Sequence, residues 1–151
     1  MSSPKDKPLS MGFSVDLKIL PIKMLKPHEE VNPRLVDELI ADIRKSGILR
    51  KAIAIDRDSK IILDGHHRVR TLEILGCKFI PCILLDYSSP SIIVLSWSSD
   101  TPLPKTLIVD SGLRGIPLPP KTSKHMVRVG ERLIHLSELE PEVNIPIHIL
   151  V

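Results

Sequence analysis

The sequence predicts an α+β fold with a mixed sheet and few helices, and three observations support this class. Short apolar runs rich in Ile, Leu and Val recur between Pro, Gly, Ser and Asp residues, which is typical of β-strands. Helical spacing of apolar residues is confined to the segments 33–46 and 66–75. No internal repeat is visible, so this mixture of strands and helices favours a single α+β unit over a repeat architecture.

The length and composition suit one ordinary domain, because 151 residues can bury a hydrophobic core. Hydrophobic residues make up 42% of the chain but aromatic residues only 3%, so Ile, Leu and Val must form that core. Residues 1–12 are polar and carry Pro4, Pro8 and Gly12. We therefore predict a flexible N-terminal tail over residues 1–12 and a single domain over residues 13–151.

The net charge and the cysteine content limit which kinds of partner and which cellular compartment the sequence suits. A formal net charge of +3 suits an anionic partner but falls short of the dense basic patches of a dedicated nucleic-acid binder, so a phosphorylated small molecule fits equally well. Cys77 and Cys82 are the two cysteines, and the chain opens with the polar MSSPKDK, so nothing indicates secretion. No apolar stretch is long enough to cross a bilayer. We expect a cytoplasmic protein with no membrane and no specific nucleic acid among its partners; the sequence leaves the oligomeric state open.

The first predicted elements are a strand, a loop and a helix. Alternating apolar residues over 15–19 predict the strand, and a proline-constrained loop over 24–30 follows it. Asn32 is a suitable N-cap for the helix, and Pro33 is favoured at its first position. The apolar face and the C-terminal cap of this helix are Leu35, Val36, Leu39, Ile40, Ile43 and Gly47.

The rest of the chain is predicted to consist mainly of strands. Residues 52–55 and 61–63 predict a hairpin joined by a polar turn. A second helix is predicted to begin after Gly65 and to end at Gly76. The remaining predicted strands are 79–85, 91–97, 106–109, 126–129 and 143–150.

The sequence Asp64-Gly65-His66-His67-Arg68 follows an apolar strand directly and opens the second helix. A helix N-terminus presents free backbone N–H groups and a positive dipole end, both suited to phosphate oxygens. The histidines and the arginine add side-chain donors there, whereas a capping aspartate with surface histidines is the plain structural alternative. Adjacent histidines point in different directions and have no HExxH or CxxC companion, so we predict no direct metal ligands.

Glu29 is a candidate general base. His28 beside it and the Pro27-constrained loop would hold its carboxylate near a hydroxyl group that is to lose its proton. The alternative is a solvated acid near the start of a helix.

A second polar cluster follows a proline-rich connection late in the chain and could bind a carboxylate or a phosphate; it comprises Lys121, Thr122, Ser123 and His125. A plain basic loop is the alternative. Trp97 could form an aromatic wall for a ligand or could pack at the rim of the core. The sequence has neither a P-loop nor a protein-kinase signature, so a nucleotide must be held by another device, for which the helix start at Asp64 is the candidate.

Together these segments resemble the archaeal free serine kinases, in order, from about residue 15 to residue 128. The matching motifs are Lys26-Pro27-His28-Glu29, Ile62-Leu63-Asp64-Gly65-His66-His67-Arg68, Leu84-Leu85-Asp86-Tyr87, Trp97 and Pro120-Lys121-Thr122-Ser123-Lys124-His125. The resemblance implies a ParB/sulfiredoxin-like domain. It also implies transfer of the terminal phosphate of ATP or ADP, with Mg²⁺, to L-serine, giving O-phospho-L-serine for cysteine biosynthesis.

The resemblance also implies roles for individual residues. Glu29 matches the base that activates the serine hydroxyl, and Asp64 lies close enough to the transferred group to matter for catalysis. The nucleotide-binding residues implied are Ser46, Gly47, Asp64, Gly65, His66, His67 and Arg68. The substrate-binding residues implied are His28, Trp97, Lys121, Thr122, Ser123 and His125.

Two neighbouring families share the implied fold but not the activity. Sulfiredoxins need a reactive cysteine in the phosphate-binding turn, which here reads Gly65-His66-His67-Arg68. ParB proteins continue into a helix-turn-helix domain, whereas this sequence ends in predicted strands, so a ParB-like DNA-binding or nuclease role is the alternative function. The region between Trp97 and Pro119 is shorter than in the longer serine kinases, so the adenosine half of the nucleotide is expected to be held differently.

Overall fold

The computed structural model describes residues 15–151, and its centre is a four-stranded mixed sheet. The strand order is β1-β5-β3-β4, formed by β1 (Asp16–Pro21), β5 (Phe79–Leu85), β3 (Ile53–Asp56) and β4 (Ile62–Asp64). β5 pairs antiparallel with β1 and parallel with β3, and β3 pairs antiparallel with β4. The mixed sheet and the α+β class are thus confirmed, whereas the predicted tail 1–12 and the domain boundary at residue 13 lie outside the described residues.

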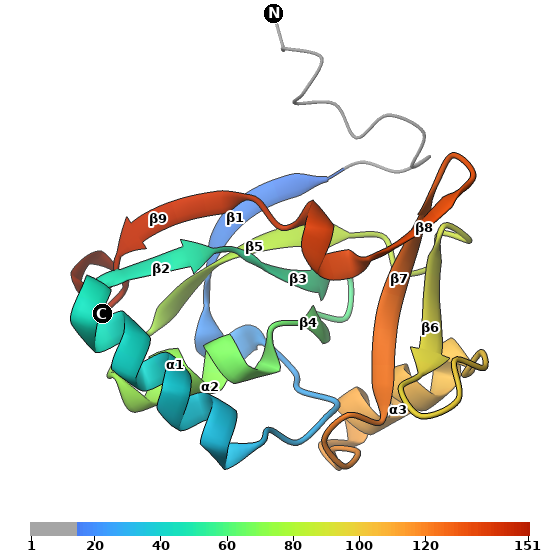
Figure 1. Cartoon of the computed structure of the whole chain (residues 1–151), viewed down its shortest axis with the longest axis horizontal. Helices are drawn as coiled ribbons and strands as arrows, with labels where there is room; N and C mark the ends of the chain where they lie inside the picture. Colours follow the sequence, from blue (N-terminus) through green and yellow to red (C-terminus); the bar gives the residue numbers. More distant parts are fainter. Residues whose placement is uncertain (1–14) are drawn as a thin grey trace, which may run out of the picture.

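Two helices pack together beside this sheet (Figure 1). α1 (Pro33–Ser46) begins as predicted, because the Asn32 side chain accepts a hydrogen bond from the Arg34 amide and Gly47 ends the helix in the left-handed conformation. α2 (His66–Ile74) starts directly after β4. Together with the sheet they bury one aliphatic core, which includes Ile43, Leu49, Ile53, Ile55, Ile62, Leu72, Ile80 and Leu84.

A second core lies on the other side of β3 and β5, where a three-stranded sheet and a third helix pack; its members include Ile61, Leu63, Ile83, Leu85, Ile92 and Ile108. The sheet is formed by β6 (Ile92–Ser96), β7 (Ser123–Val129) and β8 (Arg132–His135). The strand predicted over 106–109 was wrong, because these residues belong to helix α3 (Lys105–Arg114). Ile108, Ser111 and Gly112 are its buried residues, at helical spacing.

The remaining strands connect the end of the chain to α1. β2 (Ile48–Lys51), which the sequence analysis missed, pairs antiparallel with β9 (Glu142–Pro146). The strand predicted over 143–150 was therefore partly wrong, because a 3-10 turn, η4 (Ile147–Leu150), replaces its second half. Two further 3-10 turns, η2 (Ile22–Met24) and η3 (Leu136–Leu139), follow β1 and β8. Within residues 15–151, no helix is long and apolar enough to span a membrane.

Candidate functional site

The turn between β4 and α2 is the centre of the candidate site. Asp64 is the last residue of β4, Gly65 has a φ of 114°, and His66 is the first residue of α2. A Cβ atom on Gly65 would lie 2.4 Å from Cγ2 of Ile53, so both the backbone angle and the space require glycine. The turn thereby places the first amide groups of α2, which have no acceptor within the helix, at the end of the strand.

A cavity of about 240 Å³ lies against this turn and brings together most of the predicted site residues. The predicted residues that line it are His28, Glu29, Asp64, Gly65, His66, His67, Trp97, Lys121, Ser123 and His125. They come from the loop before α1, from the β4–α2 turn, from the end of β6 and from the start of β7. The structure therefore assembles one polar cavity from segments up to about a hundred residues apart.

Glu29 is fixed in this cavity by three neutral donors. Its Oε1 atom accepts from the amide and the hydroxyl of Ser123 at 3.1 and 3.0 Å, and its Oε2 atom accepts from the Lys121 amide at 3.2 Å. Burial raises the pKa of the Glu29 carboxyl, while these hydrogen bonds oppose the shift. A carboxylate that is held in place and has a raised pKa can accept a proton, which is what a general base requires.

His66 and His67 hold the loop that carries Glu29. The backbone N–H of His28 donates to Nε2 of His66 at 3.1 Å, and that of Asn32 donates to Nε2 of His67 at 3.0 Å. Both rings are therefore neutral with the proton on Nδ1, and burial lowers the pKa of each. The two histidines thus anchor the loop on both sides of Glu29, and each keeps one N–H that can donate to a ligand.

His28 and His125 form part of the wall of the cavity. Nδ1 of His28 donates to the Ile62 carbonyl at 2.7 Å, and Nε2 of His125 lies 2.9 Å from the Tyr87 hydroxyl. Burial lowers the pKa of His28 to about 4 and that of His125 to about 3. Both rings are neutral at physiological pH, so they shape the cavity without adding positive charge to it.

The residues at the mouth of the cavity are more exposed. Trp97 is 44% exposed, and the Lys124 ammonium group lies 4.9 Å from the centre of its ring. Lys124 also pairs with Asp100 at 2.5 Å. Thr122 does not line the cavity, because its hydroxyl group donates to the Pro119 carbonyl.

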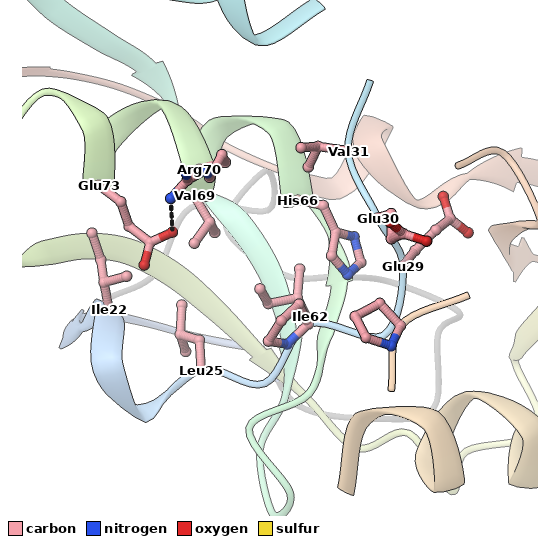
Figure 2. A pocket seen from close by; sticks show the side chains of 12 residues that line it. Ile22, Leu25, Glu29, Glu30, Val31, Ile62, His66, Val69, Arg70 and Glu73 are labelled. Carbon is pink, nitrogen blue, oxygen red and sulfur yellow. Dashed lines mark ion pairs between the residues drawn. The ribbon is translucent and has the colours of Figure 1, made fainter. Parts of the chain in front are cut away.

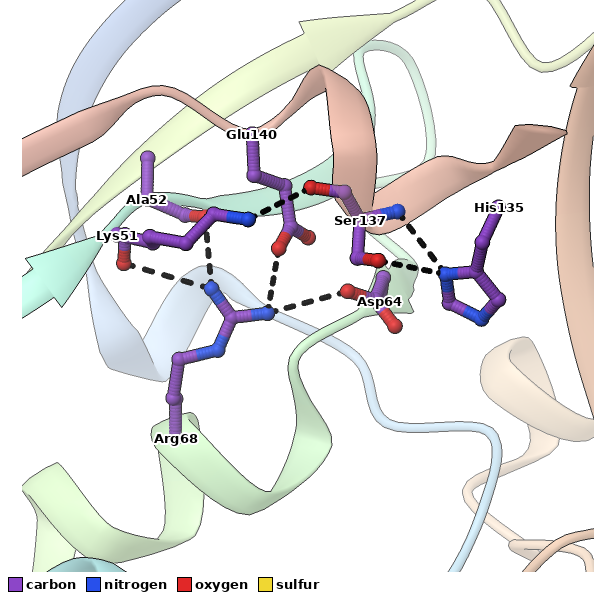
Figure 3. Close-up of polar contacts among 7 residues, drawn as sticks. All are labelled: Lys51, Ala52, Asp64, Arg68, His135, Ser137 and Glu140. Carbon is purple, nitrogen blue, oxygen red and sulfur yellow. Dashed lines mark hydrogen bonds and ion pairs between the residues drawn. The ribbon is translucent and has the colours of Figure 1, made fainter.

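The structure does not bring Ser46, Gly47 or the Arg68 side chain to this cavity. The Ser46 hydroxyl contacts Ile48 at the end of α1, and the Gly47 carbonyl accepts from the Ile147 amide. Arg68 points to the opposite side of the turn, where it binds Asp64, Glu140 and two backbone carbonyls (Figure 3). The expectation that Arg68 adds a side-chain donor at the phosphate turn therefore conflicts with this geometry, because its donors are occupied elsewhere.

A second cavity, of about 330 Å³, shares Glu29 and His66 with the first (Figure 2). Its lining includes the apolar residues Ile22, Leu25 and Val69 and the Arg70–Glu73 pair. Because its one arginine is paired with an acid, whereas Lys121, Lys124 and the start of α2 line the first cavity, the first cavity is the better phosphate site.

Two other kinds of chemistry find little support in the described part of the chain. Residues 15–151 contain no group of three or more His, Cys, Asp and Glu side chains that could hold a metal ion. Cys77 and Cys82 are buried, and burial raises the pKa of each thiol, that of Cys82 to about 12. A buried thiol with a raised pKa is a poor nucleophile, so neither cysteine suits sulfiredoxin-type chemistry.

The sequence analysis missed several residues that belong to the site. Leu35, Lys124 and His135 line the first cavity, and Glu140 contacts Arg68 behind the turn. Lys124 lies within the motif 120–125, so its position next to Lys121 and Ser123 could have indicated it. Nothing in the sequence indicated His135 or Glu140, because β8 and η3 were not predicted.

No model of a protein family matches the chain. A ParB-like protein of Sulfolobus acidocaldarius is 41% identical over 76 residues, which are 50% of this chain and 38% of that protein. An ADP-dependent L-serine kinase of Thermococcus kodakarensis is 33% identical over 87 residues, 55% of this chain and 36% of the kinase. The chain thus spans less than two fifths of the length of these curated relatives.

The fold has a solved counterpart over almost its whole length. A free serine kinase in complex with AMP superimposes with a TM-score of 0.75 at 16% identity, covering 90% of this chain and 94% of that one. At this identity the superposition establishes a shared fold. The resemblance found in the sequence is thereby confirmed: the chain is related in sequence to L-serine kinases and to a ParB-like protein, and it has the fold of the free serine kinase.

Proposed function

We propose that this protein is a free L-serine kinase, which transfers the terminal phosphate of ATP or ADP to the hydroxyl of L-serine. The observation that carries the proposal is the shared cavity, which is lined both by the hydrogen-bonded carboxylate of Glu29 and by the N-terminus of α2. The sequence relationship to ADP-dependent and ATP-dependent L-serine kinases supports it. The product, O-phospho-L-serine, would supply cysteine biosynthesis, and the cytoplasm remains the expected compartment.

The proposed step is an in-line phosphoryl transfer. Glu29 accepts the hydroxyl proton of serine, the serine oxygen bonds to the terminal phosphorus, and the bond from that phosphorus to the bridging oxygen breaks. ATP leaves as ADP, and ADP leaves as AMP. The amides at the start of α2 suit phosphate oxygens, and the Nδ1–H groups of His66 and His67, which line the same cavity, are the proposed side-chain donors. Asp64 lines the same cavity, in agreement with its implied part in catalysis.

The ends of the serine molecule have candidate partners at the mouth of the cavity. Lys121 and Lys124 line the cavity there and suit the serine carboxylate. Mg²⁺ would arrive as the nucleotide complex and be held largely by phosphate oxygens and water, as Mg²⁺ commonly is in phosphate-transfer sites.

One assay tests the proposal. The protein is incubated with L-serine, Mg²⁺ and either ATP or ADP, and O-phosphoserine is measured by ³¹P NMR. We expect phosphoserine to accumulate with one or both nucleotides, and D-serine to react more slowly. Failure to form phosphoserine with either nucleotide would refute the proposal.

The alternative is a ParB-like DNA-binding or nuclease role, and the related ParB-like protein is the observation that favours it. A DNA binder that contacts several phosphates binds tightly and loses affinity steeply as salt rises. Acidic and basic residues alternate along α1, where Asp37, Glu38 and Asp42 separate Arg34 from Arg44. Because no single-sign stripe runs along this helix, we expect weak, non-specific binding to duplex DNA at physiological salt. Tight, sequence-selective DNA binding without phosphoserine formation would favour the alternative.

A further inference from the structure

Arg68 is the centre of a partly buried polar cluster behind the β4–α2 turn (Figure 3). One guanidinium nitrogen donates to Oε1 of Glu140 at 2.8 Å and to Oδ2 of Asp64 at 3.1 Å. Another donates to the Ala52 carbonyl at 2.8 Å and more weakly to that of Lys51 at 3.4 Å. The cluster therefore ties the end of η3 to the turn that ends β4 and to the chain around β2.

Glu140 is the most enclosed member of the cluster. Its side chain is 1% exposed, compared with 18% for Arg68 and 25% for Asp64. No donor among residues 15–151 reaches its buried Oε2 atom. Burial, followed by a hydrogen bond to the Asp64 carboxyl, raises the pKa of Glu140 to about 9, and Arg68 opposes the shift. A protonated Glu140 can therefore accept from Arg68 and donate to Asp64, which an apolar side chain could not do.

The cluster reaches the candidate site through Asp64, which contacts Arg68 on one side and lines the cavity on the other. The two N–H groups of the same guanidinium nitrogen donate to Glu140 and to Asp64 at once, so Glu140 helps to hold the nitrogen that contacts Asp64. The other charged groups around Glu140 are Lys51, Arg50 and Asp42, which line a neighbouring cavity with it; the Lys51 ammonium group donates to the Ser137 carbonyl at 2.9 Å.

We propose that Glu140 is a positioning residue of the kinase site: it holds Arg68 behind the turn and thereby fixes the orientation of Asp64 toward the bound phosphates. This inference rests on the proposed kinase function. A purely structural role, in which Glu140 only attaches η3 to the rest of the fold, would affect stability but would leave the catalytic parameters of the folded protein unchanged.

Three variants separate these roles: Glu140→Leu removes the acceptor, Glu140→Gln keeps an acceptor oxygen, and Glu138→Gln changes an exposed acid of the same turn as a matched control. In the phosphoserine assay, we expect E140L to lower kcat about tenfold or more, with the KM for serine changed by less than about twofold. E140Q should stay within about threefold of the wild type, and E138Q should match it. A folded E140L with wild-type kcat would overturn the inference.

A second measurement does not depend on catalysis and so separates failure of this inference from failure of the proposed function. The ¹⁵N signals of the Arg68 guanidinium report whether its rotation is restricted and how its surroundings titrate. In the wild type we expect these signals to shift with a midpoint near pH 9, the pKa of Glu140, and E140Q should lack this shift. Arg68 signals that show a freely rotating guanidinium in the wild type would overturn the inference, even if E140L fails to fold.

Discussion

Two acids lie on opposite sides of the same turn, and the protein surrounds them differently. Glu29 is half-buried and receives three hydrogen bonds from neutral groups of the 121–123 segment. Glu140 is buried, and it shares the one guanidinium of Arg68 with a second acid, Asp64. Burial raises both pKa values, but the donors around Glu29 oppose its shift, whereas the neighbouring carboxyl adds to that of Glu140.

The two surroundings suit the two acids to the different roles proposed for them. Neutral donors keep the ionised form of Glu29 accessible, so it can give and take a proton beside a substrate. Glu140 keeps its proton at neutral pH, so it can accept from Arg68 without adding a second negative charge beside Asp64.

Gly65→Ala changes the turn that separates Glu29 from Glu140, and we expect it to have the largest effect of the variants considered. The new Cβ would lie 2.4 Å from Ile53 at a φ of 114°. Overpacking and backbone strain together should lower the free energy of unfolding by about 3 kcal/mol, measured by urea denaturation. Gly130→Ala is the matched control, because Gly130 also has a positive φ but nothing within 4 Å of its Cβ position. Equal losses in the two variants would contradict the packing argument.

Glu29→Gln changes only the proposed general base. The amide cannot accept the serine proton, so turnover should fall by a factor on the order of 10² or more. Thermal denaturation should show a folded protein, and calorimetric titration should show nucleotide affinity close to that of the wild type. Full activity in this variant would remove Glu29 from its proposed role.

Glu140→Gln tests the role of Glu140 through the pH dependence of the free energy of unfolding. Between its ordinary pKa of 4.5 and its folded value of about 9, Glu140 is ionised in the unfolded chain and protonated in the folded protein, so it lowers stability progressively as pH rises. Glutamine does not titrate. The variant should therefore gain stability relative to the wild type with rising pH, by at most about 1.4 kcal/mol for each pH unit within this window. A stability difference that is constant between about pH 5 and pH 9 would show that Glu140 does not carry this proton.

Ser123→Ala should have the smallest effect. It removes the hydroxyl donor to Glu29 but leaves the two amide donors in place. Turnover should fall about fivefold, the loss expected for one hydrogen bond, and the pKa of Glu29 should rise further. Ser99→Ala, which changes an exposed serine outside the cavity, serves as the control. Loss of activity as large as in Glu29→Gln would mean that Ser123 does more than hold the carboxylate.

Local sequence signals predicted the first half of the fold well. Asn32, Pro33 and Gly47 mark the ends of α1 directly, because caps act within a few residues. Thr106 to Val109 was predicted as a strand because a short apolar run fits a buried strand or one face of a helix equally well. A Cβ atom on Gly112 would lie 2.8 Å from Cγ1 of Ile61, so the helix packs closely against a residue that comes 51 positions earlier in the chain.

Residues of the candidate site that belong to a sequence motif could be predicted, whereas contacts between residues far apart in the sequence could not. Glu29 and the 64–67 turn stand in recognisable motifs, and the structure places them in one cavity. The partnership of Arg68 with Glu140 spans 72 residues and has no local signal. The anchoring of the Glu29 loop by His66 and His67 likewise depends on how α2 packs against that loop.

The pH–rate profile of phosphoserine formation by the wild type and by Glu29→Gln tests the central claim most directly. Burial lowers the pKa of His28, His66, His67 and His125, so these histidines stay neutral at and above pH 6.5, their ordinary value. The wild-type rate should rise through an acid limb with a midpoint above 4.5, the ordinary pKa of the Glu29 carboxyl, and loss of this limb in the variant would assign it to Glu29 rather than to a histidine. Glu29→Gln should lose both this limb and most of the rate. An unchanged limb in the variant, or no phosphoserine from the wild type with either nucleotide, would contradict the account.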